Sequence, residues 1–201
     1  MRKMSCVLAL WVLVGPALYA QEGSLVGLGG RLAQRASARI LYMNQDTNGF
    51  VGQLVVNYGQ PVWKAEYEDL GLFDKMTKGQ VWRMGDNFWS VLDTHVPLKV
   101  SGRDIGVGSY YLGVHRSQDG NSWSLAFLDP GAIREARLDA SEIAKASVDF
   151  MVPMSYSRTD ENVESLTITL DYPKKDPTNV TLRVVWGKLQ LTAPIEVMGI
   201  D

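Results

Sequence analysis

The chain has 201 residues, 46% of them hydrophobic, and its 20 lysines and arginines nearly balance its 22 aspartates and glutamates. The net charge of −2 provides no basic surface for nucleic acid or anionic lipid, so we expect neither as a partner. This length suffices for one domain with a substantial hydrophobic core.

The first twenty residues have the parts of a secretory signal peptide. Arg2 and Lys3 precede a short apolar run over 7–14, then a Gly-Pro pair and the small residue Ala20. The apolar run is shorter than the ~20 residues of a membrane-spanning helix, although an uncleaved N-terminal anchor is the alternative. We therefore predict a signal peptide over 1–20, a periplasmic or secreted protein, and no stable membrane insertion after signal removal.

Removal of the signal peptide also removes Cys6, the only cysteine, so no intramolecular disulfide is expected in the mature chain. Residues 21–36 are rich in glycine and leucine and are predicted to be a flexible N-terminal arm, followed by a single domain over 37–201. The arm contains "GLGG" at 27–30, which lacks the Lys-Ser/Thr and the βαβ context of a phosphate-binding loop. We expect no cofactor.

Alternation of apolar and polar residues predicts strands in the first two thirds of the chain. "ARILYMN" and "GQLVVNYG" make one or two strands around "QDTNG". A turn is expected near "EYEDLGLFDKM". Further strands are "FWSVLDTH" (88–95), "PLKV" (97–100), "VGSYYLGVH" (107–115) and "SWSLAFL" (122–128). The separators "SGRDIG" and "RSQDGN" are rich in Gly and Asp, as tight turns are.

The last third continues in the same way. The segment "AIREARLDASEIAKA" (132–146) predicts one or two short helices. "LTITLDY" (166–172) and "VTLRVVW" (180–186) alternate regularly on either side of the turn "PKKDPTN", and Gly187 precedes a third segment, "KLQLTAPIEV". Three consecutive strands would form an antiparallel meander with one buried face.

These elements predict a mainly β fold. Eight or nine antiparallel strands with one or two short helices are typical of a β-sandwich or a jelly-roll-like barrel, with a closed barrel as the alternative.

Neither metal nor nucleophilic catalysis has a clear basis in the sequence. His95 and His115 are the only histidines, and pairing 97–100 with 107–115 would put them on opposite faces, so no metal site is expected. No serine lies in a G-x-S-x-G turn. Asp93 and His95, two residues apart on a predicted strand, share a face and can form either an acid-base pair or an ordinary hydrogen-bonded couple.

The segment "VWRMGDN" (81–87) concentrates the polar chemistry of the chain and has two interpretations. In the structural one, Gly85 makes a turn, Asp86 or Asn87 caps backbone amides, and the Arg83 guanidinium ties strand ends together. In the functional one, these groups converge in a pocket where Arg83 meets a carboxylate or similar anion and Trp82 provides an apolar wall. The candidate binding residues are Trp82, Arg83, Asp86 and Asn87, with Tyr58 and Tyr110 as possible neighbours.

Several segments in order resemble the bacterial exported domain of unknown function family 2911, over nearly the whole mature chain. The matching motifs are "VNYGQPVWK" (56–64), "GQVWRMGDN" (79–87), "VPLKVSGRDIGVGSYYLGV" (96–114), "WSLAFL" (123–128), "VESLTITL" (163–170) and "VTLRVVWGKLQLTAPIEV" (180–197). They place the family's conserved pattern on Tyr58 and Pro61, on Trp82, Arg83, Gly85 and Asn87, on Gly108, Tyr110 and Leu112, and on Trp186. Phe88 stands where the family usually has an acidic residue. The resemblance implies an exported β-rich domain and supplies no activity.

The sequence thus favours a non-enzymatic module that binds a small ligand or an envelope protein. The alternatives are a hydrolase or isomerase that uses Asp93 and His95, and a structural envelope component, for which a large exposed apolar patch would be the sign.

Overall fold

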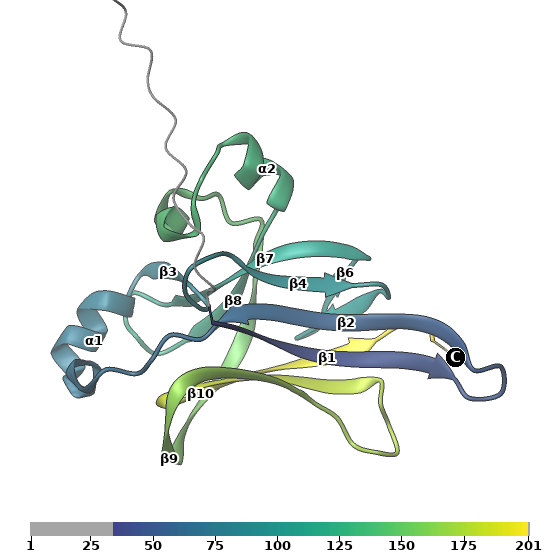
Figure 1. Cartoon of the computed structure of the whole chain (residues 1–201). Coiled ribbons are helices and arrows are strands. Elements are labelled where there is room, and N and C mark those ends of the chain that lie inside the picture. The colour runs from purple at the N-terminus through teal and green to yellow at the C-terminus, as the bar shows by residue number, and fades with distance from the viewer. Residues whose placement is uncertain (1–33, 201) are drawn as a thin grey trace, which may run out of the picture. The chain divides into compact units, whose positions relative to one another are not determined.

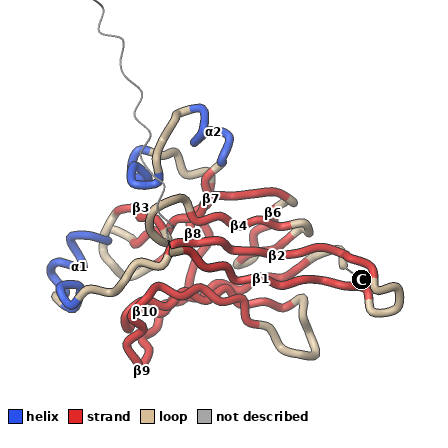
Figure 2. Tube along the Cα trace, in the orientation of Figure 1, coloured by secondary structure: helices blue, strands red, loops and turns tan. Residues whose placement is uncertain are grey.

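Antiparallel strands make up most of the computed structural model, which describes residues 34–200 (Figures 1 and 2). The ten strands are β1 (Arg35–Asn44), β2 (Gly49–Gly59), β3 (Gln80–Arg83), β4 (Ser90–Thr94), β5 (Leu98–Val100), β6 (Arg103–Ile105), β7 (Gly108–Arg116), β8 (Trp123–Leu128), β9 (Phe150–Asp171) and β10 (Asn179–Val197). The helical segments are η1 (Ala65–Glu68), α1 (Leu70–Thr77), α2 (Pro130–Glu135) and η2 (Ala140–Lys145). The predicted mainly β, antiparallel fold class is confirmed. The predicted signal peptide lies outside the described residues.

The strands form one sheet that folds over on itself. Their order is β1-β2-β4-β7-β8-β9-β10-β5-β6, and β3 also pairs with β7. The long strand β9 belongs to both halves, because its residues 150–154 pair with β8 and its residues 155–171 pair with β10. Figure 1 shows β1 and β2 lying over β9 and β10. The Tyr58 hydroxyl of β2 accepts a hydrogen bond from Ile168 N of β9 at 2.9 Å, which confirms that these layers face each other.

The hydrophobic core lies between the layers and follows the alternation of the strands. On β10 the buried residues are first even-numbered, with Val180, Leu182 and Val184, and then odd-numbered, with Leu189 and Leu191. The change occurs at Gly187, which has φ of 61° and irregular pairing with β9 on both sides. A bulge of this kind shifts the side-chain face without ending the strand. The predicted three-stranded meander is therefore wrong, since its last two strands are the single strand β10.

A second correction concerns the histidines. β5 pairs with β6, which lies within the predicted turn "SGRDIG", whereas β7 pairs with β4. Asp93 is opposite Ser109, so the odd-numbered residues of both strands, including His115, share one side of the sheet. The expected opposite orientation of the histidines is wrong. They are nevertheless apart, because the six residue steps from Ser109 to His115 span ~20 Å.

The helical segments match the sequence prediction in one region, and in another region the structure contains more helix than was predicted. α2 and η2 are the two short pieces predicted over 132–146, each begun by an aspartate whose carboxylate accepts a backbone N–H. Where only a turn was expected, η1 and α1 form, and Asp69 caps α1 by accepting from Leu72 N at 2.9 Å. Within residues 34–200 no helix has the length and apolar character needed to cross a bilayer.

The N-terminal edge also differs from expectation. β1 begins at Arg35, so the last two residues of the predicted arm over 21–36 are part of the sheet. Arg35 lies opposite Gly59 at the end of β2. This placement brings Arg35 close to the segment that follows β3.

α1 is attached to the sheet by a carboxylate that titrates at low pH. Asp74 accepts hydrogen bonds from Lys78 and from Arg116, both at 2.6 Å, and these bonds lower the pKa of Asp74. A hydrogen bond from the Ser117 hydroxyl likewise lowers the pKa of Asp119. Because the folded pKa is below the unfolded value of about 3.9, the stabilisation is complete above that value and is lost as pH falls through the folded pKa.

We therefore expect the thermal midpoint to be nearly constant from pH 7 to about pH 5 and to fall steadily below about pH 4. Asp74→Asn should lower the midpoint at pH 7 and reduce its dependence on acid. Calorimetry across this pH range measures both effects. An Asp74→Asn variant with the same acid dependence as the parent would show that this carboxylate contributes nothing to it.

Candidate functional site

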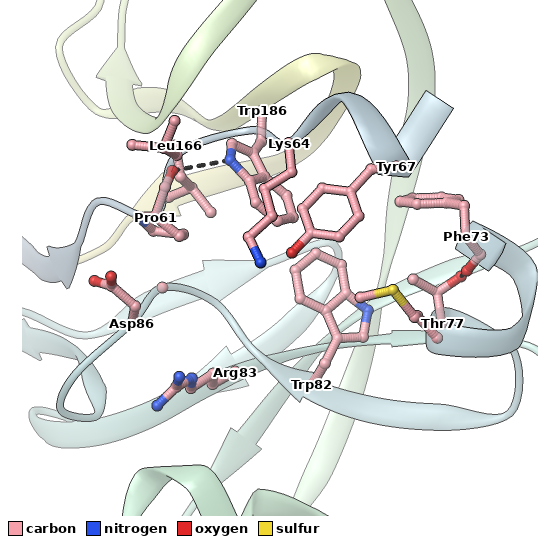
Figure 3. A pocket seen from close by; sticks show the side chains of 13 residues that line it. Pro61, Lys64, Tyr67, Phe73, Thr77, Trp82, Arg83, Asp86, Leu166 and Trp186 are labelled. Carbon is pink, nitrogen blue, oxygen red and sulfur yellow. Dashed lines mark hydrogen bonds between the residues drawn. The ribbon is translucent and has the colours of Figure 1, made fainter. Parts of the chain in front are cut away.

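A cavity of about 640 Å³ lies where η1 and α1 meet the end of β3 and the β9–β10 pair (Figure 3). Side chains from segments more than 100 residues apart line it, among them Lys64, Trp82 and Trp186. Three of the candidate residues, Trp82, Arg83 and Asp86, are in its lining. Part of the sequence motif at 81–87 therefore lines this cavity.

One wall is fixed by an extension of β2. Beyond Gly59 the chain stays extended and bonds to β9, with Trp63 N donating to Glu164 O at 2.6 Å and Leu166 N donating to Pro61 O at 3.0 Å. The indole N–H of Trp186 on β10 also donates to Pro61 O, at 2.9 Å (Figure 3). The joined strands thus hold Trp186 in one orientation facing the cavity.

Aromatic rings form the apolar end of the cavity. Trp186 lies with its ring centroid 6.4 Å from that of Trp82 and 5.3 Å from that of Tyr67, and Phe73 adds a further ring (Figure 3). The Trp82 Nε1 is buried and has no hydrogen-bond partner among the described residues. An unpaired buried donor costs about 1–3 kcal/mol, so an acceptor at this point would relieve a penalty.

The opposite end of the cavity is polar. Figure 3 shows Arg83 and Asp86 on the side away from Phe73, with the Lys64 ammonium directed between them and the rings. Lys64 is 3.4 Å from Glu66, but both side chains are more than half exposed and such a pair contributes little. Arg83 makes no hydrogen bond or ion pair with any residue of the described range 34–200. After the hydrogen bonds from Ser141, its charge helps to lower the pKa of Asp139, the residue that begins η2, while its N–H donors are not engaged by any described residue.

Arg35 performs the structural role that the sequence suggested for Arg83. Its Nε donates to Asn57 Oδ1 at 2.8 Å, its Nη2 donates to Trp89 O at 3.0 Å, and its guanidinium lies 5.9 Å from the centre of the Phe88 ring. Burial lowers the pKa of Arg35, and the nearby carboxylate of Asp86 partly offsets this. Arg35 therefore ties β1 and β2 to the segment after β3. The alternating pattern of β1 extends back to residue 35, and this signal in the sequence could have revealed that Arg35 belongs to the sheet.

The turn at 84–87 is held against the end of β2. Gly85 has φ of 146° and Asn87 has φ of 64°, so the predicted turn is present. The Ser90 hydroxyl donates to Met84 O at 2.5 Å. A Cβ on Gly59 would overlap the backbone oxygen of Asp86, so the end of β2 and the turn at 84–87 are in direct contact at this point. This contact fixes the position of Asp86 in the cavity lining.

The remaining candidate residues lie elsewhere. Asn87 is exposed and donates to Asp86 Oδ1 at 3.3 Å. Tyr58 is 3% exposed and bonds to the backbone of Ile168 in the core. The Tyr110 hydroxyl donates to Gly106 O at 3.0 Å. None of the three lines the cavity, whereas Lys64, Tyr67, Phe73 and Trp186, which the sequence analysis did not select, do.

Asp93 and His95 form a separate polar cluster on the outer side of β4. Asp93 Oδ2 is 3.7 Å from His95 Nε2, and both side chains are about two fifths exposed, at 40% and 43%. The Ser109 hydroxyl donates to Asp93 at 2.6 Å, and Gln53 lies 3.4 Å from His95 Nε2. In the described part of the chain no three His, Cys, Asp or Glu side chains are grouped to hold a metal ion.

Comparison with known proteins gives one positive finding. The model of the family described as "Protein of unknown function (DUF2911)" matches residues 43–195, which include the cavity lining and both core layers. Neither the curated proteins nor the solved structures gave a match. Because the family match covers well over half of its length, this chain belongs to the DUF2911 family.

Proposed function

We propose that this chain is an exported, non-enzymatic binding protein whose cavity holds a small organic anion with an apolar or aromatic body. The observation that carries the proposal is the presence of two cationic residues, Lys64 and Arg83, in the lining of a cavity walled by aromatic rings. Arg35, not Arg83, ties the neighbouring strands together. Arg83 makes no hydrogen bond or ion pair within the described residues, although its charge, after the hydrogen bonds from Ser141, helps to lower the pKa of Asp139 at the start of η2. Its N–H donors are therefore unused, and we infer that they serve a ligand.

The chemistry of the lining specifies the class of ligand. A planar guanidinium binds a carboxylate through two parallel N–H donors, and Lys64 adds a second positive charge. The rings of Trp82, Tyr67 and Trp186 suit a flat or apolar body, as in most small-molecule sites. Asp86 sits at the same end as Arg83 and favours ligands that also carry a hydroxyl or amine donor.

Export is the other part of the proposal and rests on the sequence. The positive start, the short apolar run and the small residue at position 20 are the features that support it. The mature protein would begin near Gln21, and its partners would be small molecules or envelope proteins of the periplasm or the extracellular space.

The two alternatives have less support. An acid-base role for Asp93 and His95 lacks an activated nucleophile, because Ser109 donates to Asp93 and not to the imidazole. A structural envelope role has one favourable observation, the exposed apolar side chains Leu41, Met43, Phe50 and Val51 on the β1–β2 hairpin.

Ligand binding is tested by titrating the protein with octanoate and with phenylacetate while tryptophan fluorescence is recorded. We expect saturable quenching, because Trp82 and Trp186 line the cavity. Arg83→Ala should weaken binding by roughly 10–100-fold, as expected for the loss of a hydrogen-bonded ion worth about 1.5–3 kcal/mol.

The matched control is Arg39→Ala, which removes the same charge from an exposed position of β1. If Arg39→Ala and Arg83→Ala weakened binding equally, the loss of affinity would come from the net charge of the protein and not from a contact with Arg83. Failure of both acids to bind would contradict the proposed function.

A further inference from the structure

A second cavity adjoins the first on the far side of two shared aromatic residues. Its volume is about 330 Å³, and it lies between η1, α1 and the β9–β10 pair. Tyr67 and Phe73 line both cavities. Tyr67 belongs to η1, which contains no buried residue, whereas Phe73 of α1 is half-buried and packs against the hydrophobic core. These two side chains form the ridge between the cavities.

The second cavity carries its own positive charge. Arg158 of β9 and Lys188 of β10 are among its lining residues, and Arg158 lies opposite Leu189, the neighbour of Lys188, across the strand pair. Within residues 34–200 neither side chain forms an ion pair with a carboxylate. Glu68 also lines this cavity, but its Oε1 accepts the indole N–H of Trp63 at 3.0 Å. Two cations against one engaged carboxylate leave a net attraction for an anion.

Aromatic side chains line the second cavity, as they do the first. Trp63 lies 5.4 Å from Tyr67 and 6.1 Å from Phe73 between ring centroids, and Tyr156 is a further lining residue. The Trp63 ring also packs 5.0 Å from Trp186 of the first cavity. The aromatic surface is therefore continuous from one cavity to the other.

The charged groups lie at the two outer ends of this aromatic surface. In Figure 3, Arg83 is on the side of the first cavity away from Phe73, while Phe73 and Tyr67 mark the side shared with the second cavity. Arg158 and Lys188 line the second cavity and not the first. The order along the surface is thus cation, aromatic rings, cations.

We propose that the two cavities form one extended site for an elongated organic dianion. One carboxylate would bind Arg83, the other would bind Arg158 and Lys188, and the apolar body would cross the ring of Tyr67. This assignment rests on the proposed function and deepens it, because it requires an anion at Arg83. It explains why separate free cations flank a single aromatic surface.

The test compares monocarboxylates with α,ω-dicarboxylates of the same chain length, from octanoate and octanedioate to tetradecanoate and tetradecanedioate. Isothermal titration calorimetry on the protein gives the dissociation constants. At the length that spans the site, we expect the diacid to bind at least about tenfold more tightly than the monoacid, since the second carboxylate binds with the first already in place.

Two sets of variants locate the second carboxylate. The double variant Arg158→Ala with Lys188→Ala should reduce the affinity for the diacid to that for the monoacid. The control, Lys174→Ala with Lys175→Ala, removes the same two charges from the exposed β9–β10 turn and should leave the preference for the diacid unchanged.

The possible failures are distinguishable. Monoacids that bind in an Arg83-dependent way, with no diacid binding more tightly at any length, would overturn the extended site and leave the proposed function intact. A diacid preference that persists in the Arg158/Lys188 variant would also overturn it. If neither class of acid binds, the proposed function itself fails.

Discussion

Arg35→Ala should lower the thermal midpoint of the protein by roughly 3–12 °C, whereas Arg83→Ala should leave it within about 2 °C. Arg35 donates one hydrogen bond to Asn57 and one to Trp89 O from a half-buried position. Hydrogen bonds from a charged group contribute about 1.5–3 kcal/mol, and a domain of this size loses about 2–4 °C per kcal/mol. Arg83 has no such partner among the described residues, and substitutions of that kind usually stay within about 0.5 kcal/mol.

Differential scanning calorimetry of the two variants and of Arg35→Lys measures these shifts. Lysine retains the charge but not the planar fork, so Arg35→Lys should fall between Arg35→Ala and the parent. The reverse ranking, with Arg83→Ala the more damaging change, would make Arg83 structural and would remove the main support for a ligand at that position.

Gly187→Ala should destabilise the protein by about 2–5 kcal/mol, the sum of two separate effects. The φ of 61° at this position costs an L-residue about 1–2 kcal/mol. The new Cβ would also overlap the indole ring of Trp63, and overpacking of this kind costs about 1–3 kcal/mol. Displacement of Trp63 would additionally disturb the ridge between the two cavities.

Urea unfolding of Gly187→Ala and of Gly102→Ala separates the two effects. Gly102 has φ of 86° but nothing within 4 Å of its Cβ position, so its substitution has only the backbone cost. Equal losses in the two variants would mean that Trp63 moves aside freely and that its packing against the β10 bulge is not a constraint.

The sequence predicted the strands well where one face is buried and one is wet. On β10 the alternation is regular on each side of Gly187, and both halves were recognised. The error was to separate them, because a glycine with positive φ is equally suitable for a turn and for a bulge. The first half of β9 was missed because its exposed run around Arg158 has no apolar alternation. It is a strand because its residues 150–154 pair with β8 and the residues that follow pair with β10.

The candidate site was only half predictable for a related reason. Trp82, Arg83 and Asp86 are close in sequence, so their local concentration was visible. Lys64 and Trp186 reach the same cavity only because the chain after β2 pairs with β9, a hundred residues later. Local periodicity carries no information on such long-range pairing. The hydrogen bonds of Arg35 were hidden for the same reason.

The position of β9 and β10 in the fold has a consequence for biosynthesis. The inner face of β1, β2 and β4, with Leu54, Val56 and Leu92, packs in one core with the long strands β9 and β10, which begin only at Phe150. A ribosome must therefore translate about three quarters of the chain before the first of these long strands begins, and contacts so distant in sequence form slowly. We therefore expect this apolar face to remain uncovered, and accessible to chaperones, until β9 and β10 have been translated.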